Sequence, residues 1–154
     1  MKKIISLSLI AVLFVSVIFC LPVAAVDNTK TTTTIEYLEN GDYIETIITE
    51  YESNARVATK SGTKTKNYTN SAGAVMWSVT VHGTFTYNGS TSQCTSAGHS
   101  TTAPGSMWSI KSASSRRSGY SAIADATATY KTSSSSKDYS MSVSLYCNAY
   151  GTLY

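Results

Sequence analysis

Apolar and polar residues alternate along the stretch from Val75 to Asn88. The odd-numbered positions except Gly83 carry apolar side chains, and the even-numbered positions from Ser78 to Thr86 are Ser, Thr or His. This period of two predicts a strand with one buried face. At about 3.3 Å per residue the stretch is much longer than the usual strand. Gly83 is therefore predicted to be a bend, where one strand ends or crosses between sheets.

Weaker alternating stretches follow and precede this one, and turn residues separate them. Asn40-Gly41 favours a two-residue hairpin turn, which would place Glu36 opposite Glu45. Alanines on one face of Tyr120 to Tyr130 leave room for the ring of Trp77 or Trp108. We expect strands at Thr34 to Glu39, Tyr43 to Tyr51, Lys64 to Thr69, Gln93 to Ala97, Trp108 to Ser112, Tyr120 to Tyr130 and Tyr139 to Ala149, with a loop at Gly98 to Gly105 and turns at Ser114 to Gly119 and Lys131 to Asp138.

Short strands with a turn roughly every ten residues indicate an all-β fold. We expect a small antiparallel β-sandwich, immunoglobulin-like and closed by one disulfide, preceded by an N-terminal β-hairpin. No stretch after residue 25 has a helical period.

The N-terminus reads as a secretory signal peptide. Lys2 and Lys3 precede an apolar run to Leu21, Pro22 follows, and small residues end at Ala25. This order predicts cleavage after Ala25 and a secreted, extracellular protein that meets the membrane only before cleavage. An uncleaved anchor is the alternative, since the run is nearly long enough to span a bilayer.

Cleavage would remove Cys20 and leave Cys94 and Cys147. An exported chain with one remaining pair of cysteines is expected to oxidise it. Two free thiols are the alternative. Cys147 is in phase with Val143 and Leu145, so its sulfur is predicted to face the core.

Charge divides the chain into two parts. Residues 26–55 carry seven acidic side chains and one lysine, for a net charge of −6, whereas residues 56–154 carry nine basic and two acidic residues, for +7. We therefore divide the chain into a signal peptide at 1–25, an acidic hairpin segment at 26–56 and a β-sandwich domain at 57–154. The acidic segment is also a candidate pro-segment.

Residues for catalysis are scarce. His82 lies on the polar face of its strand and His99 in a predicted loop, and no nucleophile motif accompanies them. A zinc site lacks ligands once the cysteines pair, and neither an EF-hand nor a phosphate-binding glycine loop is present. We expect no enzymatic activity, no cofactor and no metal site. A buried histidine beside Asp125 or Asp138 would revive a hydrolase hypothesis.

Surface residues say more about function than the candidate catalytic residues do. The eleven tyrosines are suited to contacts with sugars or proteins, and the simpler alternative is that they cover the edges of the sandwich. A basic patch towards anionic wall polymers is predicted from Lys60, Lys64, Lys66, Arg116, Arg117, Lys131 and Lys137. Nucleic-acid binding is not expected, because no recognition motif is present.

The stretch W-S-V-T-V-H-G-T-F-T-Y-N-G-S-T-S-Q-C-T-S, Trp108 and the late S-L-Y-C-N-A-Y-G together resemble a family of short, uncharacterised, signal-peptide-bearing secreted proteins of gut Firmicutes. The resemblance implies a Gram-positive exporter and a Cys94–Cys147 pairing, with no activity. The start at Gly83 is also similar to lactococcin-type bacteriocins, which lack a comparable cysteine pair.

Two functions follow as expectations. The first is a secreted, non-enzymatic module that binds a cell-wall polymer, a glycan or another surface protein. The second is the precursor of a cationic antimicrobial or bacteriocin-like protein, whose acidic segment at 26–56 masks the body.

Overall fold

The computed structural model describes residues 29–51 and 58–154. The signal peptide, its cleavage after Ala25 and the boundary between residues 56 and 57 lie outside the described residues. Among the described residues, no helix has the length and apolar character needed to cross a membrane.

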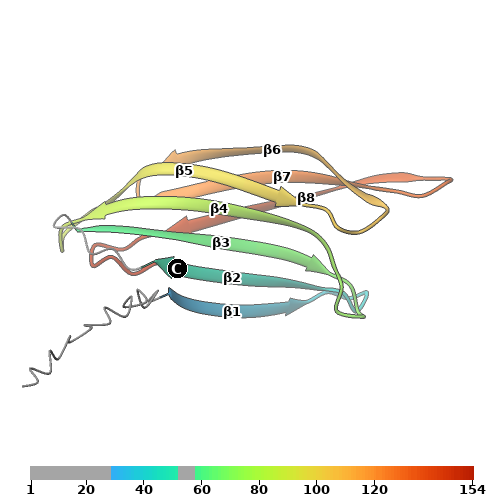
Figure 1. The fold of residues 1–154 in the computed structure, drawn as a ribbon, viewed down its shortest axis with the longest axis horizontal. Coiled ribbons are helices and arrows are strands. Elements are labelled where there is room, and N and C mark those ends of the chain that lie inside the picture. Colours follow the sequence, from blue (N-terminus) through green and yellow to red (C-terminus); the bar gives the residue numbers. More distant parts are fainter. Residues whose placement is uncertain (1–28, 52–57) are drawn as a thin grey trace, which may run out of the picture.

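Two antiparallel sheets build the fold, as Figure 1 shows. Sheet A has the order β1-β2-β3-β4-β5 and sheet B the order β6-β7-β8. The strands are β1 (Thr29–Tyr37), β2 (Tyr43–Tyr51), β3 (Thr59–Thr69), β4 (Val75–Tyr87), β5 (Ser92–Thr102), β6 (Trp108–Ser118), β7 (Ser121–Lys131) and β8 (Ser136–Tyr146). The predicted all-β, two-sheet antiparallel architecture is confirmed.

The core lies between the two sheets, where the alternation of β4 places it. Trp77, Val79, Val81 and Phe85 are buried on the inner face of β4. The sheet facing it contributes small and branched side chains, namely Ala122, Ala124, Ala126 and Ala128 of β7 and Val143 and Leu145 of β8. Large rings on one sheet thus meet alanines on the other, as dense packing requires.

Gly83 does not end a strand, so the predicted bend was wrong. β4 continues from Val75 to Tyr87, and its register against β5 shifts just after Gly83, between Thr84 and Phe85. A Cβ atom at Gly83 would lie 2.6 Å from Cε2 of Phe85 and 3.1 Å from Cβ of Ala122. The glycine therefore gives the Phe85 ring its space inside the core.

The N-terminal hairpin is part of sheet A rather than a separate unit, because all of β2 pairs with β3. Its predicted turn was wrong by one residue. Tyr37 pairs with Tyr43, so Glu36 lies opposite Ile44, and Ile35 opposite Glu45. The repulsion expected between Glu36 and Glu45 is thus avoided.

Two further strands are longer than the sequence predicted. β5 runs through His99 to Thr102, where a loop was expected, and β6 includes Arg116 and Arg117, which were assigned to a turn. Their polar residues form strands because each pairs along a neighbour, β4 or β7.

Two finer features of the predicted fold are not confirmed. Every strand neighbours the next strand in sequence within its sheet, whereas an immunoglobulin domain has Greek-key connections. Cys94 and Cys147 are both buried, and no disulfide joins them.

The sandwich is closed along one side and open along the other. On the closed side, the ring nitrogen Nδ1 of His99 in β5 lies 3.0 Å from Oγ of Ser115 in β6, and Arg117 donates to the carbonyl oxygen of Thr95. On the open side, the backbones of β1 and β2 lie close to no strand of sheet B. Sheet A therefore extends past sheet B by these two strands, as Figure 1 shows.

Candidate functional site

Three tyrosines gather at the end of the sandwich that holds the β6–β7 turn. Tyr146 is the last residue of β8, Tyr120 lies in the turn before β7, and Tyr154 comes from the C-terminal segment. The ring centroids of Tyr120 and Tyr146 are 5.8 Å apart, and those of Tyr146 and Tyr154 are 5.4 Å apart in a stacked arrangement. We call these three residues the exposed tyrosine cluster, because Tyr120 is 52% and Tyr154 50% exposed.

The C-terminal segment folds back beside β8 and holds Tyr154 in place. The backbone groups of Tyr146 and Tyr154 exchange two hydrogen bonds, of 3.0 and 3.1 Å, and Leu153 forms a bridge with Cys147. The side chain of Leu153 is buried and lies against Gly62 of β3, where an added Cβ would collide with it. One buried leucine thus anchors a segment whose last ring is left on the surface.

The turn from Asn148 to Thr152 shapes the same region. Oδ1 of Asn148 accepts hydrogen bonds from the backbone nitrogens of Tyr150 and Thr152, at 2.9 and 3.0 Å. Gly151 has a φ of 83°, and a Cβ there would lie 2.5 Å from the Tyr87 ring. The turn is therefore rigidly built, while Nδ2 of Asn148 has no hydrogen-bond partner among the described residues.

A cleft of about 350 Å³ opens beside these rings, and we call it the tyrosine cleft. One wall is the segment from Cys147 to Ala149, and the other is the β4–β5 turn. Two hydrogen bonds join the walls, because Gly89 donates to the carbonyl oxygen of Ala149 and Ser92 donates to that of Cys147. The residues that line it are Ser90, Thr91, Ser92, Tyr120, Cys147, Asn148, Ala149 and Tyr154. They offer aromatic faces, hydroxyls and an amide, and none is Asp, Glu, Lys or Arg. This lining suits an uncharged polar ligand.

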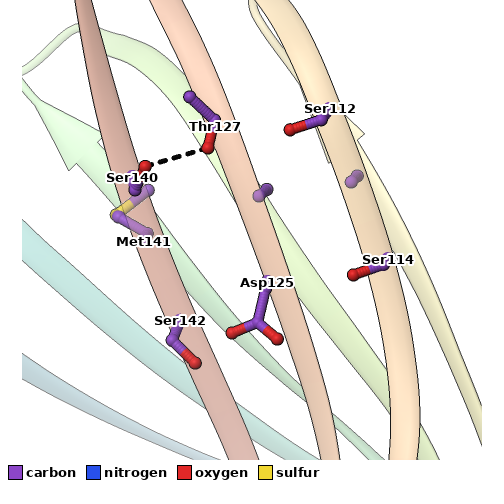
Figure 2. Close-up of a pocket in the computed structure, with 9 residues that line it drawn as sticks. Ser112, Ser114, Asp125, Thr127, Ser140, Met141 and Ser142 are labelled. Atoms are coloured by element: carbon purple, nitrogen blue, oxygen red, sulfur yellow. Dashed lines mark hydrogen bonds between the residues drawn. The ribbon is translucent and has the colours of Figure 1, made fainter.

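A second depression, of about 420 Å³, lies on the outer face of sheet B. Figure 2 shows Asp125 on the middle strand, with Ser114 and Ser142 on the strands beside it. Hydrogen bonds from Ser142 and Arg116 lower the pKa of Asp125, so its carboxylate is already occupied. The depression has no exposed ring, and the tyrosine cleft is the stronger candidate site.

Neither histidine lies beside Asp125 or Asp138. Nε2 of His82 lies 3.1 Å from Oγ of Ser100 on the outer face of sheet A, and His99 contacts Ser115. Asp125 contacts Arg116, and Asp138 accepts a hydrogen bond from Nζ of Lys111 at 2.5 Å. The geometry that would revive the hydrolase hypothesis is therefore not found. Within residues 29–51 and 58–154, no group of three or more His, Cys, Asp or Glu side chains is placed to hold a metal ion.

The seven predicted basic residues do not form one patch. Lys60 is buried and lies 3.1 Å from Glu50, Arg116 pairs with Asp125, and Nζ of Lys137 lies over the Tyr139 ring. Lys64 and Lys66 lie together on β3, where burial and the charge of Lys66 lower the pKa of Lys64. The basic side chains are thus divided between faces and partly neutralised.

The two cysteines lie near the tyrosine cleft. The backbone nitrogen of Cys94 donates to the carbonyl of Gly119, and that of Cys147 to the carbonyl of Tyr120, so both strands meet the same turn. Burial raises the pKa of both thiols, that of Cys147 to about 11. As free thiols they would be poor nucleophiles at neutral pH.

Sequence reasoning missed the tyrosine cleft because it extended the last strand to Ala149. Asn148 and Gly151 were the available signal, since both are turn residues. Comparisons with protein-family models, curated proteins and solved structures found no match to this chain. The resemblance to a secreted family of gut Firmicutes stays a prediction.

Proposed function

We propose that this chain is a secreted, non-enzymatic β-sandwich protein that binds at the cell envelope, and that the tyrosine cleft takes an uncharged saccharide unit of an envelope glycan. The observation that carries the proposal is the exposed tyrosine cluster beside a cleft lined by hydroxyls and an amide, without a charged side chain. Export rests on the N-terminal signal pattern.

The chemistry of the cleft matches a sugar better than a peptide or an anion. Aromatic faces bury the C–H faces of a sugar ring, while hydroxyls and amides bond its hydroxyl groups. Tyr120 and Tyr154 supply the faces, and Asn148 supplies an unused amide donor. Because the rings are packed against Tyr146, little side-chain entropy is lost on binding.

The contacts of the ionisable groups support a binding role without catalysis. The histidines contact serines, and the aspartates of sheet B contact Arg116 and Lys111. A general acid or base must reach the reacting group, and no ionisable Asp, Glu, His or Lys side chain lines the tyrosine cleft. We therefore assign no catalytic residue and no cofactor.

We also propose that Cys94 and Cys147 form a disulfide in the exported protein. Both are buried, both bond through their backbone to the Gly119–Tyr120 turn, and Cys94 lies close enough to contribute to the raised pKa of the Cys147 thiol. A bond there would tie β5 to the end of β8, beside the cleft. Intact mass of the secreted protein should rise by two hydrogens on reduction, and an unchanged mass would contradict the disulfide.

The precursor hypothesis keeps the charge asymmetry in its favour, but the place of β2 favours retention of the acidic segment. Removing residues 26–56 would leave β3 as a bare edge and would take away Glu50, which contacts buried Lys60 at 3.1 Å. A secreted species that begins near Val57 and inhibits related bacteria would favour the precursor instead.

The binding proposal is tested by sedimentation with purified cell walls and with de-charged wall polysaccharide. Tyr120→Ala/Tyr154→Ala should weaken binding by about tenfold or more, since losing two ring contacts costs on the order of 1 to 3 kcal/mol. Tyr37→Ala is the matched control, because Tyr37 is 75% exposed at the opposite end of the sandwich. Equal binding by the wild type, the double variant and the control would contradict the proposal.

A further inference from the structure

β1 is an edge strand that lacks most of the usual protections against pairing. All nine of its residues are exposed, it contains no proline, and its register with β2 has no bulge. Natural edges are normally shielded by proline, bulges, short length or inward charges, and of these β1 has only the charges of Lys30 and Glu36. The opposite edge of sheet A is covered by β6, and the C-terminal segment covers one end of β8. β1 therefore stands out as an available pairing edge.

The β1–β2 turn shows which backbone groups of β1 are free. Leu38 donates to the carbonyl of Asp42, and this pair continues the β1–β2 register. Because antiparallel pairs alternate between bonded and non-bonded, the even-numbered residues of β1 bond to β2. The N–H and C=O groups of the odd-numbered residues then face outward. These are Thr29, Thr31, Thr33, Ile35 and Tyr37.

We propose that β1 pairs with β1 of a second copy, antiparallel, with a two-fold axis at Thr33. Bonded residues must pair with bonded residues, so odd positions face odd positions. Only the register centred on Thr33 uses all nine residues, and it places Lys30 directly opposite Glu36 of the other copy. The two-fold axis repeats this Lys30–Glu36 pair, as an isologous interface requires.

Charges on the inner face of sheet A support this register. Lys60 lies 3.1 Å from Glu50, and Glu50 lies 4.0 Å from Lys30. Glu36 of the second copy would lie beside Lys30, so that basic and acidic side chains alternate from β3 across the interface. Glu36 forms no ion pair within residues 29–51 and 58–154. Lys30 and Glu36 would form a non-bonded pair, in which side chains approach closest.

Apolar residues on the outer face fit the same interface. Ile35 is 50% exposed, and it would face Thr31 of the other copy, while Tyr37 would face Thr29. Pairing would cover part of these side chains. The assembly then stops at two copies, because each chain has used its one open edge of sheet A.

The oligomeric state of the full chain, measured by analytical ultracentrifugation over a range of concentrations, tests the dimer. Lys30→Glu and Glu36→Lys, each alone, should weaken dimerisation at least tenfold, because like charges then face each other across the axis. An equimolar mixture of the two variants should form a heterodimer, since every facing pair becomes complementary. A monomer at all concentrations, or a dimer insensitive to both reversals, overturns the proposal.

The register is tested by single cysteines. Thr33→Cys should cross-link to itself on mild oxidation, because facing bonded residues have Cα atoms about 5.5 Å apart, within disulfide range. Thr31→Cys should not, since its two copies would lie about 13 Å apart along the strands. Equal cross-linking of both overturns the register.

Proline variants separate dimer loss from unfolding. Thr33→Pro removes an outward N–H and should give a folded monomer, as judged by circular dichroism. Thr34→Pro removes a bond to β2 and should also disturb the hairpin. A Thr33→Pro variant that is folded and still dimeric overturns the proposal. Saccharide binding by the tyrosine cleft does not depend on this edge, so the two proposals fail separately.

Discussion

Both ends of the sandwich carry an aromatic cluster, but they are built differently. At the end that holds the β7–β8 turn, the Trp108 ring stacks on Trp77 at 6.3 Å and contacts Tyr68, Tyr130 and Tyr139 at 5.1 to 5.4 Å. We call these five residues the packed aromatic cluster. They come from both sheets, so their rings fill the space between the sheets.

The exposed tyrosine cluster draws on one strand end, one turn and the C-terminal segment, and no strand of sheet A contributes a ring to it. Its rings therefore contact each other and solvent rather than an opposing sheet. Aromatic residues close the core at one end and stay exposed at the other, where we propose that they bind a saccharide. Under this proposal, position relative to the two sheets, rather than aromatic content, decides whether a ring serves stability or binding.

The largest effect should come from breaking the packed aromatic cluster. Trp77 is 1% exposed, and Trp77→Ala should lower the free energy of unfolding by about 3 to 5 kcal/mol. Urea unfolding followed by circular dichroism measures this loss. Trp77→Phe is the matched control and should cost less, because it keeps a ring and removes an indole N–H that has no partner. Equal losses for the two variants would mean that ring packing does not set stability at this end.

An intermediate effect should come from Leu153, which joins the exposed cluster to the core. Leu153→Ala should cost roughly 2 kcal/mol, the low end for a buried leucine, and should also weaken saccharide binding. Binding falls because Tyr154 loses its anchor beside Cys147. Wall sedimentation and urea unfolding on one preparation measure both. Unchanged binding with reduced stability would show that the position of Tyr154 is unimportant.

The smallest effect concerns Tyr68, whose hydroxyl donates to Asp42 and so links the β1–β2 turn to the packed cluster. Burial and this hydrogen bond raise the pKa of Tyr68. A raised pKa in the folded state means that the stabilising contribution is present below about pH 10 and is lost as the pH rises further.

Alkaline titration of tyrosinate absorbance checks this difference. The native wild type should show a component that ionises above the ordinary range, and Tyr68→Phe should remove it. Tyr37→Phe is the control from an exposed position. If Tyr37→Phe rather than Tyr68→Phe removed the late component, the component would belong to Tyr37, and the raised pKa of Tyr68 would be contradicted.

The fold class was predictable because its signals are local. The alternation around Trp77 and Val79 and the alanines of β7 were enough to place the core between two sheets. The strand lengths could not be predicted, because polar stretches such as the one around His99 form strands only by pairing with a neighbouring strand. Gly83 looked like a bend, and its actual role depends on the Phe85 ring, which sequence pattern alone does not place.

The candidate site was predictable only as a tyrosine-rich surface. Tyr120 and Tyr154 are 34 positions apart in the sequence, and they come together because the C-terminal segment returns along β8. The predicted basic patch was wrong for a related reason. A count of charges along the sequence does not show that Arg116 pairs with Asp125 or that Lys60 is buried against Glu50.

Saccharide binding at the tyrosine cleft is best tested by titrating the isotope-labelled protein with neutral envelope saccharides and following two-dimensional NMR spectra. Binding at the cleft should give saturable shifts for Tyr120, Asn148 and Tyr154, with Trp108 and Tyr139 unchanged. Shifts confined to the packed aromatic cluster, or absent from the tyrosine cleft at saturating sugar, would contradict it.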